Sequence, residues 1–365
     1  MENEKYLTEQ IITYLGNKRK LLKHISNEVE TILCEMGKEK VNICDLFSGS
    51  GVVARMLKQY SNKLYVNDLE EYSYIINECY LTNKDDFNEK FYQECYDIIA
   101  SSPNIEGIIT NNYAPQDDNN IKEGERVFYT RDNAITIDTI RTAIDKIPNS
   151  YKKFFLAPLL YEASVHANTS GVFKGFYKSK TSNIGKFGGE GENALERIKG
   201  KITLQKPILS DNNAIVRLFK EDANILVKHL QNIDITYIDP PYNQHPYGSN
   251  YFMLNTIIKN EIGPHISKVA GIPDDWNKSL YNKKTEALKT FEELVTNIDS
   301  KYLIISYNNE GFISLDEMSS MLSKYGELTI KNIDYIAFRG SRNLKNREIH
   351  TTEFLFILKK NKNEE

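Results

Sequence analysis

A short apolar strand, a glycine turn, a helix and a second strand follow one another near the N-terminus, and this succession constrains the fold most strongly. Residues 41–47 form an apolar run typical of a buried strand, and residues 48–51 turn the chain. Residues 52–60 then place apolar side chains on one side of a helix, and residues 63–67 form the next strand. Such a βαβ unit places its two strands parallel in one sheet. The sequence therefore predicts an α/β fold.

The pattern of strands resumes only late in the chain. Further strands are predicted at residues 233–239, 302–307, 328–333 and 353–358. Residues 85–210 contain helical stretches and polar loops but no comparable strand. We therefore expect a discontinuous sheet domain, residues 1–84 and 211–365, into which a mainly helical lobe, residues 85–210, is inserted.

Charge is distributed unevenly along the chain. The formal net charge is -4, yet residues 151–206 hold ten Lys and Arg against four Glu, a local charge of +6 that leaves -10 on the rest. A basic region of this kind indicates either a solvated, lysine-rich surface or a face that binds nucleic acid.

Several other classes of protein are disfavoured. The four cysteines stand apart without the spacing of a zinc site, so we expect no metal. The N-terminal residues are polar and lack the apolar core of a secretory signal, and no apolar run is long enough to span a membrane. We therefore expect a cytoplasmic protein without a membrane partner.

The glycine turn lies between acidic residues that suit a cofactor. Asp45 precedes Gly49 and Gly51, and Asp68 follows the second strand, where it is suited to accept hydrogen bonds from ribose hydroxyls. Three interpretations remain open: a turn without a ligand, a dinucleotide site, because residues 49–54 fit the spacing GxGxxA, and a site for S-adenosylmethionine. Asp45 favours the third, because its carboxylate would repel a pyrophosphate and attract the ammonium group of an amino acid.

The run Asp239-Pro-Pro-Tyr242 directly follows a predicted strand. Adjacent prolines lack N–H donors and have restricted backbone angles, so they form a rigid elbow with free carbonyl oxygens. Asp239 offers a carboxylate acceptor, the carbonyl of Pro240 a second acceptor, and Tyr242 a flat ring. An ordinary proline turn is the alternative for these four residues alone, and the glycine turn upstream argues against it.

These groups suit the methylation of an amino group on a ring. The lone pair of adenine N6 is delocalised, and two acceptors that each take one N–H would localise it. A ring stacked on the base adds about 1–3 kcal/mol, and a methyl donor in line with the lone pair completes the arrangement. Because N6 lies inside duplex DNA, the base must first flip out of the helix.

Five segments together resemble the Dam-type family of N6-adenine DNA methyltransferases, in the group whose recognition region lies between the cofactor motif and the catalytic motif. They are Tyr14-Leu-Gly-Asn-Lys-Arg-Lys-Leu-Leu22, Asp45-Leu-Phe-Ser-Gly-Ser-Gly51, Asn67-Asp68, Asp239-Pro-Pro-Tyr242 and Ile304-Ile-Ser-Tyr-Asn308. The resemblance implies a Rossmann-like methyltransferase sheet with helices on both faces and an inserted, mainly helical DNA-recognition lobe. It also implies S-adenosylmethionine as the methyl donor and double-stranded DNA as the substrate.

The resemblance assigns roles to individual residues. Asp239, Pro240 and Tyr242 are expected to hold the target amino group and its base. The residues expected to bind the cofactor are Tyr14, Lys18, Asp45, Phe47, Gly49, Gly51, Asp68 and Asp222, the last of which equally fits a helix N-cap. The residues expected to contact DNA are Lys174, Lys178, Lys180, Arg339 and Arg342, with a solvated basic loop as the alternative for each.

Other activities remain as alternatives. Methylation of cytosine N4 uses the same chemistry, although that group usually carries Ser in the position of Asp239. Methylation of RNA or of another planar amine, a catalytically silent DNA-binding protein and a nicotinamide oxidoreductase are further alternatives. A cognate restriction endonuclease is a candidate partner, and residues 260–287 receive no role from the sequence.

Overall fold

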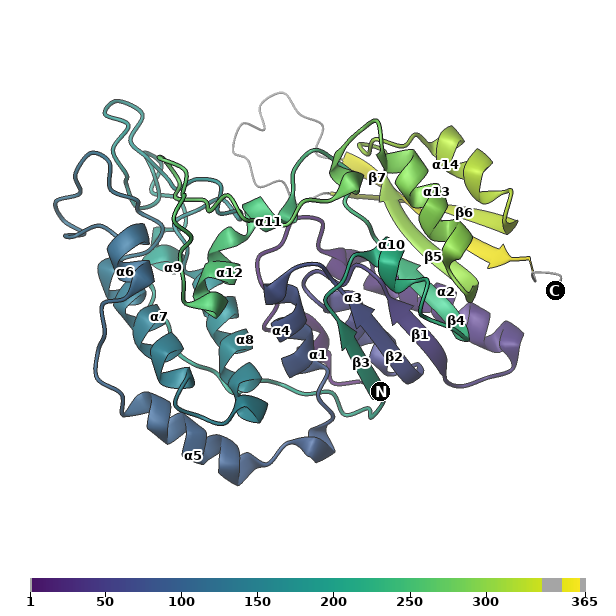
Figure 1. Ribbon diagram of the computed structural model, residues 1–365, viewed down its shortest axis with the longest axis horizontal. Helices are drawn as coiled ribbons and strands as arrows, with labels where there is room; N and C mark the ends of the chain where they lie inside the picture. The colour runs from purple at the N-terminus through teal and green to yellow at the C-terminus, as the bar shows by residue number, and fades with distance from the viewer. Residues whose placement is uncertain (1, 337–349, 362–365) are drawn as a thin grey trace.

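Seven strands form one sheet in the computed structural model, which describes residues 2–336 and 350–361 (Figure 1). Their bounds are β1 Val41–Asp45, β2 Ser61–Asn67, β3 Ile215–Phe219, β4 Ile233–Ile238, β5 Ser300–Asn308, β6 Gly326–Ile336 and β7 His350–Lys360. The order across the sheet is β3-β2-β1-β4-β5-β7-β6. Strands β1 to β5 run parallel, whereas β7 runs antiparallel to β5 and β6. The sheet is mixed and mostly parallel, which confirms the α/β prediction.

Helices bury both faces of this sheet. One face packs against α2 (Leu22–Met36) and α3 (Val52–Lys58), and the other against α10 (Ala223–Leu226), α13 (Ala287–Asn297) and α14 (Leu315–Leu322). Strand β4 is buried along its whole length, with Tyr237 on the first face and Ile238 on the second. Because neither face meets water, the central strands are nearly continuous apolar runs, and this is why the sequence identifies them.

Strand β3 is not among the strands predicted from the sequence. It lies at the edge of the sheet and, among the described strands, pairs with β2 alone. Its side chains are exposed or half-buried; Ile215 is 55% exposed. A short edge strand with an exposed Arg217 at its centre shows neither a buried run nor a clear alternation.

A second group of helices lies beside the sheet (Figure 1). It comprises α4 (Glu71–Tyr80), α5 (Glu89–Ala100), α6 (Ile108–Tyr113), α7 (Arg131–Ile144), α8 (Asn149–Val165) and α12 (Phe252–Lys259). These helices share one hydrophobic cluster, so α12 packs with helices that precede it by about 90 residues or more. No helix in the described part of the chain is both long and apolar enough to cross a membrane.

Short elements complete the chain. They are α1 (Glu4–Thr8), α9 (Leu195–Lys199), α11 (Tyr247–Asn250) and the 3-10 helices η1 (Lys18–Leu21), η2 (Lys84–Asp86) and η3 (Leu280–Asn282).

The strand order creates a crevice at the carboxyl end of the sheet. After β1 the chain proceeds outward through β2 to β3, whereas β4 lies on the other side of β1 and leads to β5. Loops that leave neighbouring strands in opposite directions leave a crevice between them, which is where open α/β sheets bind ligands. The last residue of β1, Asp45, pairs in register with Tyr237, two residues before Asp239. The acidic ends of both strands therefore meet at this edge.

The N-terminal segment is fastened to α3 by a buried arginine. Arg55 is 1% exposed, and its guanidinium group donates to the carbonyl oxygens of Tyr6, Glu9 and Gln10 at 3.0 Å. It also lies over the ring of Tyr80, at 3.9 Å from the centroid. These contacts fix the residues that lead into the segment 14–18.

We expect Arg55→Met to lower the free energy of unfolding by about 3 kcal/mol, because three buried carbonyl oxygens would lose their donor. Urea denaturation followed by circular dichroism measures this change. The control is Arg217→Met on the exposed edge of β3, which we expect to change stability by less than about 0.5 kcal/mol. Equal stabilities of the two variants would contradict the anchoring role of Arg55.

Candidate active site

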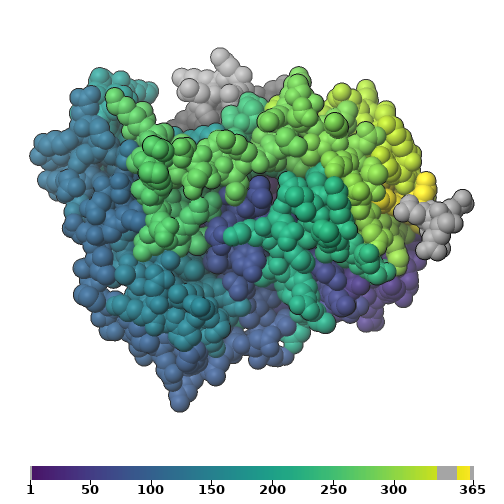
Figure 2. Space-filling view, viewed as in Figure 1, coloured from purple at the N-terminus to yellow at the C-terminus, as the bar shows by residue number. Residues whose placement is uncertain are grey.

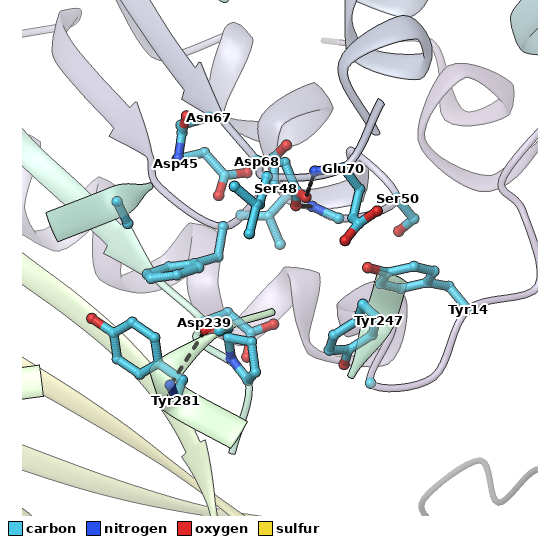
Figure 3. Close-up of a pocket in the computed structure, with 18 of the residues that line it drawn as sticks. Tyr14, Asp45, Ser48, Ser50, Asn67, Asp68, Glu70, Asp239, Tyr247 and Tyr281 are labelled. Atoms are coloured by element: carbon cyan, nitrogen blue, oxygen red, sulfur yellow. Dashed lines mark hydrogen bonds between the residues drawn. The ribbon is translucent and has the colours of Figure 1, made fainter. Parts of the chain in front are cut away.

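A pocket of about 910 Å³, including the open space at its mouth, lies at the carboxyl ends of β1, β2 and β4 (Figure 3). Its wall combines segments that are distant in sequence: residues 14–18, the glycine turn, residues 67–70 at the end of β2, residues 221–223, Asp239 after β4, residues 247–248, and residues 277–282. Asp68 and Glu70 lie on one side of the pocket in Figure 3, and Asp239 and Tyr281 lie on the other.

The glycine turn is shaped by a carboxylate and by an aromatic ring. Gly49 has a φ of 50°, and its N–H donates to Oδ2 of Asp68 at 2.7 Å. A Cβ atom at this position would lie 2.8 Å from the ring of Tyr14, so only glycine fits. Gly51, with a φ of 75°, is the N-cap residue of α3 and packs against Asn77 instead of lining the pocket.

Two acidic residues lie together at this end of the pocket. Asp45 is completely buried, and neither of its carboxylate oxygens receives a hydrogen bond of normal geometry from the described residues. Burial, reinforced by Asp239 and Asp68, raises the pKa of Asp45 well above its usual value, although the backbone N–H groups of Phe47 and Ala54 oppose this. Burial also raises the pKa of Asp68, against the backbone hydrogen bonds that it receives. A cationic ligand would relieve this accumulation of acidic groups.

Asp239 is held by a lysine from the N-terminal motif. Lys18 Nζ lies 3.0 Å from Oδ1 of Asp239 and 3.0 Å from Oε1 of Glu353. Its side chain is 4% exposed, compared with 18% for Asp239. Burial alone would lower the pKa of Lys18, but the two carboxylates hold it well above its usual value. Burial raises the pKa of Asp239 to about 6, against the pull of Lys18.

Stacked tyrosines fix the N-terminal motif. The ring of Tyr14 stacks on Tyr247 and on Tyr251, with centroids 5.1 and 4.7 Å apart. The hydroxyl of Tyr251 accepts from the N–H of Leu15 at 2.7 Å, and that of Tyr247 donates to the Leu15 carbonyl at 3.3 Å. Lys18 therefore reaches Asp239 from a backbone that is fastened at its start.

The structure brings most of the predicted cofactor residues together. Those that line the pocket are Tyr14, Lys18, Asp45, Phe47, Gly49, Asp68 and Asp222. Asp222 also caps α10, because its Oδ1 accepts from the N–H of Asn224 at 2.8 Å, so the helix-cap interpretation holds beside the pocket position. Of the predicted catalytic residues, Asp239 lines the pocket, whereas Pro240 is buried beside it and Tyr242 packs edge-on against Tyr307.

Several pocket residues have no signal in the sequence. Glu70 is buried, bonds to Asn255 Nδ2 at 2.8 Å, and has a pKa raised to about 7 by burial and by Asp68. Tyr281 meets the ring of Phe47 edge-on, with centroids 5.4 Å apart. No periodicity or motif marks these positions, because distant segments bring them to the pocket.

The segment without a predicted role, residues 260–287, connects the pocket to the helical group. On the side of the helical group, the carbonyl of Gly271 accepts from the Tyr113 hydroxyl at 2.7 Å. On the side of the pocket, Asn277 Nδ2 donates to the Leu69 carbonyl at 3.0 Å, and Asn282 Nδ2 donates to the Asn243 carbonyl at 2.7 Å. The green band across the top of Figure 2 contains this segment, which spans both parts of the molecule.

The three predicted DNA-contacting lysines lie outside the pocket. Lys174 and Lys180 are exposed, and Lys178 is half-buried, with its Nζ 5.1 Å from the centroid of the Phe176 ring. Their loop begins near the catalytic segment, because the N–H of Phe173 donates to the Asn250 carbonyl at 2.7 Å. The predicted Arg339 and Arg342 lie outside the described residues.

The site combines two chemical capacities. Its acidic, glycine-lined end suits a ligand that carries positive charge. Beside it, Asp239 presents a carboxylate of which Lys18 engages only Oδ1 among the described ion pairs. Oδ2 and the carbonyl of the following proline can then accept two hydrogen bonds from one amino group.

Comparisons with known proteins give a family match and several relatives. Residues 14–321 match the family model of the D12 class N6 adenine-specific DNA methyltransferases. The chain is 29% identical to the type II methyltransferase M.NlaIII of Neisseria lactamica, over 96% of this chain and 99% of that protein. It is also 29% identical to the type II methyltransferase M.CviAII of Paramecium bursaria Chlorella virus 1, over 95% and 98% of the two chains. A third relative, the modification methylase StsI of Streptococcus sanguinis, is 31% identical over 95% of this chain but only 52% of its own length.

Proposed function

The chain belongs to the D12 class of N6 adenine-specific DNA methyltransferases, and we propose that the pocket at the carboxyl ends of β1 and β4 is where it transfers a methyl group from S-adenosylmethionine to adenine N6. The observation that carries this assignment is the position of Asp239, which lines the same pocket as the glycine turn and is held there by Lys18. Membership of this family sets aside methylation of cytosine N4 and hydride transfer, and the intact run from Asp239 to Tyr242 argues against a silent DNA-binding role.

The residues of the pocket fit the methyl donor. S-adenosylmethionine supplies an activated methyl group on a positively charged sulfonium. The carboxylate of Asp45, which lacks a hydrogen bond of normal geometry, suits its ammonium group. Asp68 suits the ribose, while the rings of Phe47 and Tyr281, with Asp222 nearby, suit the adenine of the donor.

Asp239 and Pro240 provide the two acceptors for the target amino group. Each takes one N–H of N6, which localises the nitrogen lone pair and directs it towards the methyl group. Lys18 fixes Oδ1 of Asp239, so the carboxylate is oriented before the base arrives and no rearrangement is needed. We assign to Tyr242 the stacking on the flipped base.

We assign target recognition to residues 85–210 and the chemistry to residues 1–84 and 211–365. The hydrogen bond from Phe173 to Asn250 supports this assignment, because it joins the start of the basic loop to the end of α11. α11 follows the catalytic motif closely in the chain, so DNA bound at the basic loop would lie near Asp239. Lys174, Lys178 and Lys180 would then face the phosphates of double-stranded DNA, with Arg339 and Arg342 as further candidates.

The relatives suggest the biological setting. Two of them are type II methyltransferases that align with this chain over nearly their whole length, and a third is a modification methylase. We therefore propose that the protein is the modification enzyme of a restriction–modification system, in the cytoplasm, with a cognate endonuclease as its functional partner. Sequencing DNA from cells that express the protein, with modified bases identified, tests the target base and reveals the recognised sequence.

We expect Asp239→Asn to reduce methyl transfer to adenine by at least about a hundredfold, because Asn keeps the size of the side chain but presents one acceptor and no charge. Transfer of labelled methyl groups from S-adenosylmethionine to double-stranded DNA measures the rate. The control is Asp234→Asn at the opposite end of β4, which we expect to stay within a few-fold of the wild type. Full activity in Asp239→Asn, or label on cytosine alone, would contradict the assignment.

The rate should fall as the pH drops through about 6, because protonation of Asp239 removes its ability to accept both a lysine and an amino hydrogen. This fall, the acidic limb of the pH–rate profile, should appear in kcat/KM for S-adenosylmethionine, which reports the ionisation of the free enzyme. We expect it at a lower pH in kcat, because the bound sulfonium stabilises the carboxylate form. An acidic limb in kcat/KM below pH 5 would contradict this role of Asp239.

Charge reversal of Lys174, Lys178 and Lys180 should weaken DNA binding and flatten its salt dependence, by about 0.9 in log–log slope for each phosphate that the protein no longer neutralises. Fluorescence anisotropy of a labelled duplex at several salt concentrations measures both. Reversal of Lys38, Lys40 and Lys63, at the amino-terminal edge of the sheet, serves as the matched control. Equal slopes for the two triple variants would exclude a DNA-binding face at the basic loop.

A further inference from the structure

A buried glutamate from the last strand forms a second ion pair with Lys18, beside the one between Lys18 and Asp239. Glu353 is 1% exposed and lies on β7, beyond the residues 14–321 that match the family model. Its Oε1 lies 3.0 Å from Lys18 Nζ and accepts from the Ser306 hydroxyl at 2.6 Å. β7 brings it there because it lies between β5 and β6, with Glu353 paired in register to Asn308.

One ammonium group is therefore shared by two carboxylates. Burying a carboxylate costs several kcal/mol unless an opposite charge and hydrogen bonds compensate, and Lys18 alone would serve Asp239. With both carboxylates ionised, the second one leaves an excess negative charge in the buried group, which costs free energy. The second carboxylate also reduces the electrostatic effect of the Lys18 ammonium group on Asp239.

We propose that Glu353 is a positioning residue for methyl transfer: it fixes Lys18 against Oδ1 of Asp239 and offsets part of the ammonium charge, so that Asp239 remains a strong acceptor for the target amino group. This inference rests on the proposed function. Without the charge of Glu353, Lys18 would bind Asp239 alone, and the carboxylate would hold the amino hydrogen less strongly.

The other groups around Asp239 do not replace this effect. The charged or titratable groups that face it are Lys18 from η1, Glu353 from β7, Asp45 from β1, Tyr237 from β4, Tyr242 after β4 and Tyr247 from α11. Burial raises the pKa of the three tyrosines, which keeps them neutral near neutral pH. Asp239 raises the pKa of Asp45 on the cofactor side, whereas the charge of Glu353 itself raises the pKa of Asp239.

The test compares Glu353→Gln with Ser306→Ala. Gln keeps the size and the oxygen acceptor but removes the charge, whereas Ser306→Ala removes a hydrogen bond to Glu353 and leaves its charge. We expect Glu353→Gln to move the acidic limb of kcat/KM for S-adenosylmethionine downward, on the order of one pH unit. We also expect it to lower kcat by up to roughly tenfold, the rate equivalent of one pKa unit of lost acceptor strength. Ser306→Ala should leave the limb at the wild-type pH, whatever its effect on the rate.

The outcomes separate this inference from the proposed function. An active wild type together with an unmoved acidic limb in Glu353→Gln would overturn the role of Glu353 and leave the proposed function standing. A wild type that does not methylate adenine would overturn both. If circular dichroism shows that Glu353→Gln does not fold, Glu353→Asp carries the test, because it withdraws the carboxylate by one methylene. It should shift the limb in the same direction by less, and a limb at the wild-type pH would overturn the inference.

Discussion

The contact between Lys18 and Asp239 joins the two parts of the sequence on which the site depends. Lys18 comes from the N-terminal segment, and Asp239 follows a strand more than 200 residues later. Removing either partner of a buried ion pair leaves the other charge uncompensated, which typically costs about 3–5 kcal/mol. The pair therefore fixes the N-terminal segment against the carboxyl end of β4, where the chemistry is assigned.

Several buried contacts elsewhere in the structure hold these two residues in place. Arg55 fastens residues 6–10 to α3, and the stacked Tyr14, Tyr247 and Tyr251 fasten the segment that follows. Parallel pairing of β1 with β4 brings Asp45 and Asp239 to one edge of the sheet. A site assembled from the ends of parallel strands is rigid because its supports are buried on both faces, and rigidity is what electrostatic catalysis requires.

The sequence predicts the parts of this site that are local in the chain. The strand before Asp45, the glycine turn and the position of Asp68 can be read from one βαβ unit, and Asp239 can be read from its own motif. The edge strand β3 cannot, because its exposed side chains carry no pattern. Nor can Glu353 or Tyr281, because their places depend on the order of strands in the sheet and on the path of residues 260–287. Contacts of this kind are set by tertiary structure, and the neighbouring residues in the sequence do not predict them.

A structure of the protein with duplex DNA and a non-reactive analogue of S-adenosylmethionine would test the central claim most directly. The distance to measure is from N6 of the flipped adenine to Asp239 Oδ2 and to the carbonyl oxygen of Pro240. The account predicts that both lie within hydrogen-bonding distance, about 2.6–3.2 Å, with Lys18 still on Oδ1 and the analogue on the opposite side of N6. An amino group held by other residues, with Asp239 turned away from the base, would contradict it.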